Sequence, residues 1–319
     1  MTTPQPTSRF DLFRWLRALR WQGWKTVRIV VPAALVVYFL VWRVFLTPDV
    51  MFAILFVVFV TYGMAFEFIK KFSPFLGLLL SYDSLRGFIP YITKHIHYST
   101  MIDFDSWVGH GTLPTVWLQH LLYHGHLQWY DFYFYGLYML HFVVPVLFAV
   151  LVWRTRPQQY WRYVWAFVVL SYSAFITFLL FPAAPPWMAA QNGYIPHIEK
   201  LSTDIWWAFG VHNFPTLYAK FAPNPVAAVP SLHSAYPLLV ALFVWKLYGR
   251  KWGLISLIYP ISVWVGVVYM GEHYLFDVIT GVTYAVVSFL VVDWLMDRRQ
   301  RRQRRALRSR RPAVTAGAV

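Results

Sequence analysis

The chain has 319 residues, of which 59% are hydrophobic and only 13% are charged. Soluble domains carry about a quarter charged residues, so this composition excludes an ordinary soluble enzyme and indicates an integral membrane protein. Cysteine is absent, which excludes disulfide bonds and thiolate metal sites within this chain.

The formal net charge of +15 is concentrated at the two ends of the chain. Residues 1–26 alternate arginines with Trp, Leu and Phe, and this pattern predicts a cytoplasmic amphipathic helix at the membrane surface. Residues 297–319 are an Arg-rich tail, which we also predict to be cytoplasmic. Such a tail could bind nucleic acid, but beside apolar spans we expect contact with anionic membrane lipids and no nucleic acid.

Between these ends, residues 27–296 are predicted to be a membrane domain. Apolar stretches of about 20 residues, the length that crosses a bilayer, recur along it. They occupy residues 27–46, 51–69, 132–153, 164–181, 234–250, 252–270 and 278–296. Two cytoplasmic ends require an even number of spans, so we predict one more at 73–92, with a re-entrant segment there as the alternative. The predicted fold class is an all-α polytopic bundle of about eight spans.

With this count, the basic loops that share the cytoplasmic side are 70–71, 154–156 and 249–251. Two long connections, 93–131 and 182–232, are then predicted to face outward.

The first connection contains His120, His124 and His126, whose close spacing could hold a zinc ion. A glutamate directly after the first histidine, as in HExxH, is missing. We therefore expect an interfacial role for these histidines, no metal and no other cofactor.

The same connection carries Asp103 and Asp105, an Asp-x-Asp pair. Membrane glycosyltransferases use outward-facing carboxylates, which makes glycosyl transfer an alternative function, although it leaves the histidines described below unexplained. A second alternative is a non-enzymatic transporter in which outward-facing His and Asp residues relay protons.

Two stretches far apart in the sequence are predicted to meet at one depth in the membrane. His233 begins an apolar run in VPSLHSAYP, and His273 and Asp277 are four residues apart in MGEHYLFDVITG. On a helix that spacing puts both side chains on one face, where the carboxylate can fix the imidazole tautomer. The two spans between these stretches each cover about 24–28 Å, so the chain returns to the outer interface where His233 lies.

The motif Pro-Ser-Leu-His-Ser at 230–234, followed by His-Tyr-Leu-Phe-Asp at 273–277, resembles the type 2 phosphatidic acid phosphatase superfamily. The Leu of the first motif, the Tyr of the second and FPAAPPW at 181–187 are similar to its inositol phosphorylceramide synthase branch. The resemblance covers about residues 160–296 and implies the six-helix core of that superfamily.

The resemblance also implies a role for each motif residue. His273 would attack phosphorus and form a phosphohistidine, Asp277 would orient His273, and His233 would protonate the leaving group. Ser231 would hydrogen-bond a phosphate oxygen.

The cations with which this superfamily binds phosphate are missing from the matching positions, one of which is Val267. Positive groups must then come from elsewhere, because the transferred oxygens carry negative charge. Arg86 is the first candidate, and Lys220 and Lys200 in the outer connection come next. The alternative for Arg86 is an ion pair with Asp83 on the same helix.

Together these features predict a metal-independent lipid phosphatase or phosphotransferase with its site open to the outer leaflet of the plasma (inner) membrane. Its substrate would be a lipid phosphate, pyrophosphate or phosphodiester. Water as acceptor would make the enzyme a phosphatase, whereas an alcohol would make it a phosphotransferase. Only an enzyme of this kind would carry a covalent phosphate on His273.

Overall fold

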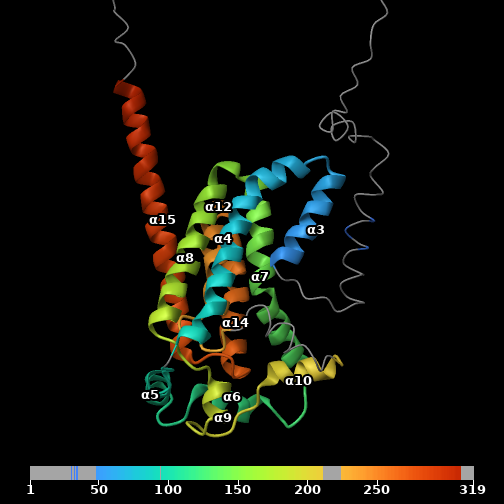
Figure 1. Ribbon diagram of the computed structural model, residues 1–319, viewed down its shortest axis with the longest axis vertical. Coiled ribbons are helices and arrows are strands. Elements are labelled where there is room, and N and C mark those ends of the chain that lie inside the picture. Colours follow the sequence, from blue (N-terminus) through green and yellow to red (C-terminus); the bar gives the residue numbers. More distant parts are fainter. Residues whose placement is uncertain are drawn as a thin grey trace, which may run out of the picture. The chain divides into compact units, whose positions relative to one another are not determined.

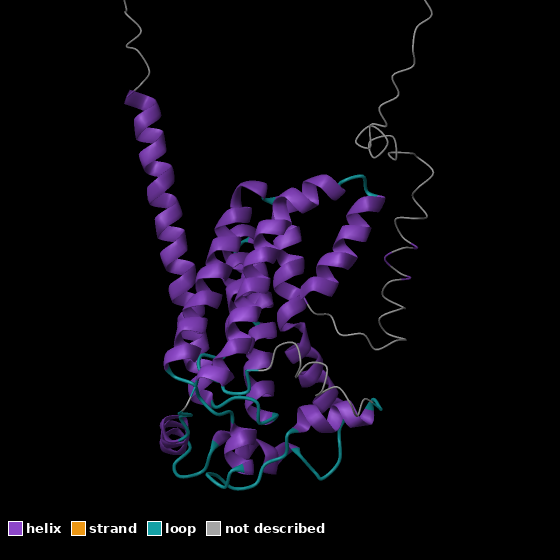
Figure 2. Cartoon of the chain, in the orientation of Figure 1, coloured by secondary structure: helices purple, strands orange, loops and turns teal. Residues whose placement is uncertain are grey.

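The computed structural model describes residues 48–93, 95–210 and 224–309, together with single residues at 30, 32 and 34. Within this part the chain is helical and has no strand beyond isolated bridges, which confirms the all-α prediction (Figure 2). Outside the described residues lie the predictions for 1–26, for most of 27–46, for Lys220 and for 310–319.

Contacts within the chain divide it into two units, Met1–Leu80 and Ser81–Val319. In the first unit, helix α3 (Pro48–Thr61) ends in a turn at Gly63, whose φ of 68° lies in the left-handed region that favours glycine. Helix α4 (Ala65–Ile92) follows at once. The predicted span at 51–69 is therefore wrong in its C-terminal bound, since the apolar helix ends at Thr61. Hydropathy does not register a turn made of apolar residues.

Helix α4 also changes the reading of two neighbouring segments. The basic residues at 70–71 lie inside this helix, so they do not form the predicted loop. Residues 73–92 belong to the same helix, which has 28 residues and a length of about 42 Å. A re-entrant segment needs a reversal of the chain, and α4 has none, so the helix favours the predicted span.

The second unit holds the remaining α-helices of the described chain. They are α5 (Ser99–Val108), α6 (Pro114–Leu122), α7 (Trp129–Thr155), α8 (Tyr160–Leu180), α9 (Pro186–Gln191), α10 (Leu201–Ala208), α12 (Leu232–Tyr248), α13 (Arg250–Ser256), α14 (Ile258–Tyr269) and α15 (Leu275–Ser309). Helices α7, α8, α12, α14 and α15 run side by side (Figure 1). Helices α5, α6, α9 and α10 gather at one end of this bundle, which we call the cap end.

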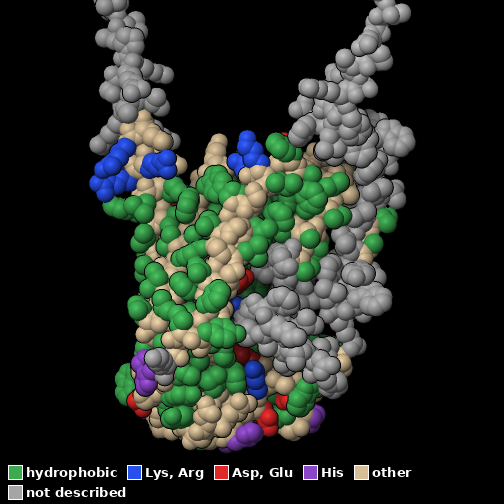
Figure 3. Space-filling view, in the orientation of Figure 1, with side chains coloured by type: hydrophobic (Ala, Val, Ile, Leu, Met, Phe, Trp, Pro, Cys, Tyr) green, Lys and Arg blue, Asp and Glu red, His purple; other side chains and the backbone are tan. Residues whose placement is uncertain are grey.

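Several of these helices are long and apolar enough to cross a membrane. Among the described residues, the long ones are Trp129–Thr155, Pro157–Leu180, Arg250–Tyr269 and Leu275–Gln303, and α12 is a shorter apolar helix. Hydrophobic side chains cover the flanks of the bundle, and Lys and Arg side chains gather at the far end of α15 (Figure 3). The chain is therefore a multi-pass membrane protein, while the total of eight spans stays a prediction.

Helix α15 runs without a break through residue 297, the predicted start of the Arg-rich tail. Near that position a network of charged side chains joins three helices. Arg162 of α8, which is buried, pairs with Asp293 and with Asp297 of α15, the latter at 2.6 Å. Lys246 of α12 pairs with the same Asp293. A buried guanidinium requires such partners, so the network fixes α8, α12 and α15 against one another at the end opposite the cap.

Candidate active site

His233 lies in the first turn of α12, where a serine-rich motif starts the helix. Ser231 is the N-cap residue, and its Oγ accepts hydrogen bonds from the backbone N–H of Ser234 at 3.3 Å and from its hydroxyl at 3.1 Å. Serine is among the best residues at this position because it satisfies a free backbone N–H of the first turn. Trp264 of α14 donates its indole N–H to the Ser234 carbonyl at 3.2 Å, which fixes this turn against α14.

His273 lies in the tight turn between α14 and α15. Gly271 has a φ of 74°, and the carbonyl of Val267 accepts the N–H groups of Glu272 and His273 at 3.0 and 3.1 Å. The prediction that His273 and Asp277 share a helix face is therefore wrong in detail, because α15 begins only at Leu275. The turn nevertheless brings the two side chains together.

The three side chains predicted to be catalytic form a continuous chain of polar contacts. His273 Nδ1 lies 3.2 Å from Asp277 Oδ2, and His273 Nε2 lies 3.0 Å from His233 Nδ1. A carboxylate only accepts, so it fixes the tautomer in which Nδ1 of His273 donates and Nε2 keeps its lone pair. Asp277 is 0% exposed and His273 only 5%, which removes water from competition for these contacts.

The two motifs are also joined through their backbones. The N–H of Ser231 donates to the Asp277 carbonyl at 3.0 Å. A Cβ at Gly281 would lie 2.3 Å from the Ser231 carbonyl oxygen, so only glycine permits this approach of α15 to the start of α12. The hydroxyl of Ser231 is buried and serves as the N-cap, and it still has its own proton to donate.

Two residues of α7 that sequence reasoning missed line the same site. The ring of Tyr138 stacks on His233 at 4.2 Å between centroids and 15° between planes. His141 is 3% exposed, and its ring centroid lies 3.9 Å from that of His233. Its Nδ1 lies 2.6 Å from the Tyr138 carbonyl oxygen. The signal in the sequence was a Tyr and a His three residues apart inside an apolar span, a spacing that shares one helix face.

The residues predicted to bind phosphate through a positive charge lie in different surroundings. Arg86 Nη2 lies 3.6 Å from Asp83 Oδ1, as the ion-pair alternative predicts. The charge of Arg86 also acts on His233, so the guanidinium lies within electrostatic reach of the site. Lys200 packs its Nζ 3.8 Å from the ring centre of Trp187, and Lys220 lies outside the described residues.

Described residues of both long connections, 93–131 and 182–232, contact the turn that carries His273. The N–H of Trp187, in the FPAAPPW stretch, donates to the Gly271 carbonyl at 3.1 Å. The side-chain amide of Gln119 in α6 donates to the carbonyls of Tyr269 and Glu199 at 3.0 and 2.8 Å. The turn is thus held by the cap end as well as by its own helices.

The histidines and aspartates of the connection 93–131 differ in their surroundings. His126 Nδ1 lies 3.1 Å from the carbonyl oxygen of His124, and His126 Nε2 lies 2.7 Å from the side-chain amide of Gln128. Three metal-binding side chains do not gather anywhere in the part of the chain that the structure describes. Asp103 is exposed, whereas Asp105 is buried and receives two backbone hydrogen bonds from α15.

The fold and the site define a polytopic membrane protein with an Asp–His–His chain of contacts at the start of two helices, in which Asp277 and His273 are buried and His233 is half-buried. A family model comparison agrees with the motifs: the model described as the PAP2 superfamily matches residues 99–291, more than half of the chain. The chain belongs to this superfamily, the type 2 phosphatidic acid phosphatases, which confirms the resemblance predicted from the sequence.

Two curated relatives extend the comparison. The chain is 32% identical over 171 residues to the phosphoinositol dihydroceramide synthase of Bacteroides thetaiotaomicron, a match that covers 50% of this chain and 55% of that protein. It is 25% identical over 165 residues to the inositol phosphorylceramide synthase of Candida albicans, covering 47% of this chain and 33% of that protein. The chain thus matches about half of one relative and a third of the other. No solved structure matches the chain.

Proposed function

We propose that this protein is a membrane lipid phosphotransferase that moves a phosphorylated headgroup from a donor lipid to the hydroxyl of an acceptor lipid. The observation that carries the proposal is the chain of contacts from Asp277 through His273 to His233. The names of the two relatives support phosphoinositol as the headgroup and a ceramide or dihydroceramide as the acceptor. Water in place of the lipid acceptor would make the same site a phosphatase.

The reaction has two in-line steps at phosphorus. In the first, Nε2 of His273 attacks, the bond from phosphorus to the donor oxygen breaks, and His233 gives that oxygen a proton. In the second, His233 takes the proton of the acceptor hydroxyl, the acceptor oxygen attacks, and the bond from phosphorus to Nε2 breaks. Asp277 keeps Nδ1 of His273 protonated and stabilises the positive charge that the ring gains on phosphorylation.

The two imidazoles must separate when the substrate binds. Reacting atoms stand about 3–3.5 Å apart before attack, and a leaving oxygen needs a further hydrogen bond to its acid. Phosphorus and its leaving oxygen therefore need about 6–7 Å between the two nitrogens, whereas these nitrogens are 3.0 Å apart in the resting protein. Displacement of His233 from its stacking contact with Tyr138 would open this space.

Arg86 is proposed to neutralise the non-bridging oxygens of the transferred group. Its guanidinium is 15% exposed and acts electrostatically on His233. We expect Arg86→Gln to lower kcat/KM by about 10²–10³-fold, because a lost charge-stabilising donor costs that much in sites of this kind. Initial rates across donor concentrations measure the effect. Arg154→Gln, an exposed arginine at the opposite end of the bundle, is the control, and an equal loss in both variants would contradict this role.

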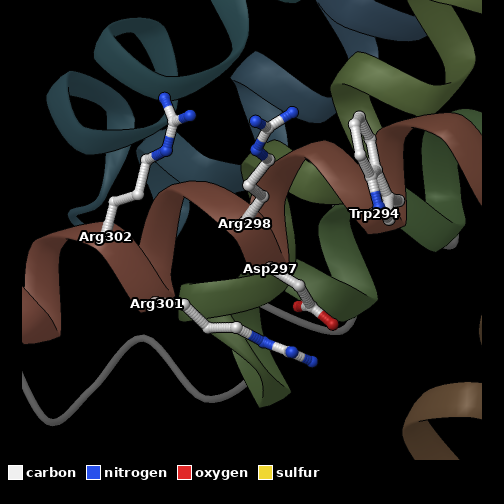
Figure 4. Close-up of a pocket in the computed structure, with 5 residues that line it drawn as sticks. All are labelled: Trp294, Asp297, Arg298, Arg301 and Arg302. Carbon is white, nitrogen blue, oxygen red and sulfur yellow. The ribbon is translucent and has the colours of Figure 1, made fainter.

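The same site is proposed to face the outer leaflet of the plasma (inner) membrane. Basic side chains lie at the opposite end of α15, and such residues concentrate on the cytoplasmic side of membrane proteins. There Trp294, Asp297 and three arginines surround a hollow on α15, with Arg298 lying 5.2 Å from the ring centre of Trp294 (Figure 4). An indole beside guanidinium groups suits the membrane interface, so we propose that this hollow receives anionic lipid headgroups.

The experiment that tests the function is a panel of donors and acceptors with the purified full chain. Donors are a lipid monophosphate, a lipid pyrophosphate and phosphatidylinositol; acceptors are water, ceramide and dihydroceramide; EDTA is present throughout. The proposal expects a phosphoinositol ceramide product that requires both lipids and persists in EDTA. Release of free phosphate alone would make the protein a phosphatase, and no turnover with any donor would overturn the proposal.

A further inference from the structure

Asp105 occupies an unusual position for an aspartate in an outer connection. It lies in α5 at the cap end and is 0% exposed. Its Oδ2 accepts the backbone N–H of Leu275 at 2.8 Å, and its Oδ1 accepts that of Phe276 at 2.9 Å. These are the first two residues of α15, the helix that carries Asp277.

The residues just before α15 supply no side chain that accepts the N–H groups of Leu275 and Phe276. The first backbone N–H groups of a helix lack partners within the helix, and a short polar side chain just before it usually accepts one. Here Tyr274 precedes the helix and cannot reach back in that way. Asp277 accepts the N–H of Tyr274 at 2.9 Å, and Asp105 accepts the next two. Two carboxylates, 172 residues apart in sequence, thus set where α15 begins.

We propose that Asp105 is a positioning residue for the reaction: from outside the catalytic hairpin it holds the first turn of α15 so that Asp277 faces His273. The proposal rests on the function proposed above. Asp277 Oδ2 is shared between His273 Nδ1 and the N–H of Tyr274, so a small rotation of the first turn would weaken both contacts. Because α5 belongs to the first outer connection, that connection takes part in shaping the site.

The neighbouring aspartate provides a matched control. Asp103 lies on the same helix, two residues earlier, and is exposed. We expect Asp105→Asn to lower kcat by about 10²-fold, the loss that a displacement of about 1 Å can cause in a catalytic group. KM should change by less than about threefold, because Asp105 does not touch the substrate, and Asp103→Asn should stay within about twofold of the wild type.

The pH profile supplies a readout that a merely structural role would not move. Burial raises the pKa of Asp105 to about 6, the two backbone N–H groups oppose that rise, and the charge of Asp277 adds to it. Tyr274, just before α15, also interacts electrostatically with Asp105. As the pH falls through about 6, Asp105 gains a proton and loses an acceptor, so kcat should fall. The Asn variant should lack this ionisation.

Hydrogen exchange at the amides of Leu275 and Phe276 completes the test. Faster exchange in Asp105→Asn, with kcat lowered, KM retained and the unfolding temperature within a few degrees of wild type, supports the inference. Two results overturn it: kcat within twofold of wild type despite faster exchange, or loss of kcat together with a collapse of the unfolding temperature. If the wild type shows no turnover on any donor, the proposed function fails, whereas an active wild type with a fully active Asp105→Asn variant contradicts only this inference.

Discussion

Alanine in place of His273 is expected to lower turnover by about 10⁴-fold or more and to remove all covalent phosphate from the protein. The reason is the tautomer that Asp277 imposes: the contact at Nδ1 leaves the lone pair of His273 on Nε2, the atom that attacks phosphorus. Quenching a reaction with a ³²P-labelled donor in alkaline SDS, where phosphohistidine survives, measures the bound label. One label per active chain is expected in the wild type and none in His273→Ala.

The control for this experiment is His120→Ala, which removes an exposed histidine of α6. It should retain both the label and the turnover of the wild type. A His273→Ala variant that still carried label would show that another residue is the nucleophile. Turnover that disappears together with the unfolding transition would be loss of folding, so thermal unfolding of both variants is recorded alongside.

The broad features of this fold follow from hydropathy and charge. Apolar stretches of spanning length predict helices in a bilayer, because a backbone in lipid must satisfy its own hydrogen bonds. Counting the two spans between His233 and His273 was enough to predict that both lie at one depth, and the contact of 3.0 Å between them agrees with that prediction. The depth of a residue in the membrane follows from how many residues separate it from the end of its span, because each helical residue rises by a fixed amount.

Details within a few residues were less predictable. The turn at Gly63 interrupts apolar sequence, and hydropathy averaged over a span conceals it. The turn at Gly271 falls between two predicted spans, but hydropathy does not indicate where the next helix begins. At Gly271 the consequence reaches the site, because His273 leaves the helix on which the spacing of four residues had put it. The pair still meets, since the side chain of Asp277 in the first turn can reach back to the residues before the helix.

The contacts between neighbouring helices could not be predicted from the sequence. Tyr138 and His141 reach His233 from α7, and nothing in their own stretch indicates which helix packs beside it. Asp105 illustrates the same limit. The Asp-x-Asp pattern suggested a pair of exposed carboxylates, but one of the two is buried against a helix start 170 residues away. Such pairings depend on how spans pack in the plane of the membrane, for which depth gives no information.

Alanine in place of His233 is expected to lower kcat with a lipid donor by about 10²–10⁴-fold, the usual contribution of a general acid. The loss should depend on the leaving group. A lipid alkoxide needs a proton as its bond to phosphorus breaks, whereas nitrophenolate is stable without one. With a nitrophenyl phosphate ester as donor, formation of the phosphohistidine should therefore be nearly as fast in His233→Ala as in the wild type.

The second step then separates the two roles proposed for His233. Its imidazole must also deprotonate the acceptor hydroxyl, and this need is the same whichever donor supplied the phosphate. His233→Ala should consequently release a rapid burst of about one nitrophenolate per active chain and then turn over slowly, with labelled His273 accumulating. Stopped-flow absorbance measures the burst. Equal losses with lipid and nitrophenyl donors, and no burst, would mean that His233 assists neither proton transfer and serves instead to hold His273 through their contact of 3.0 Å.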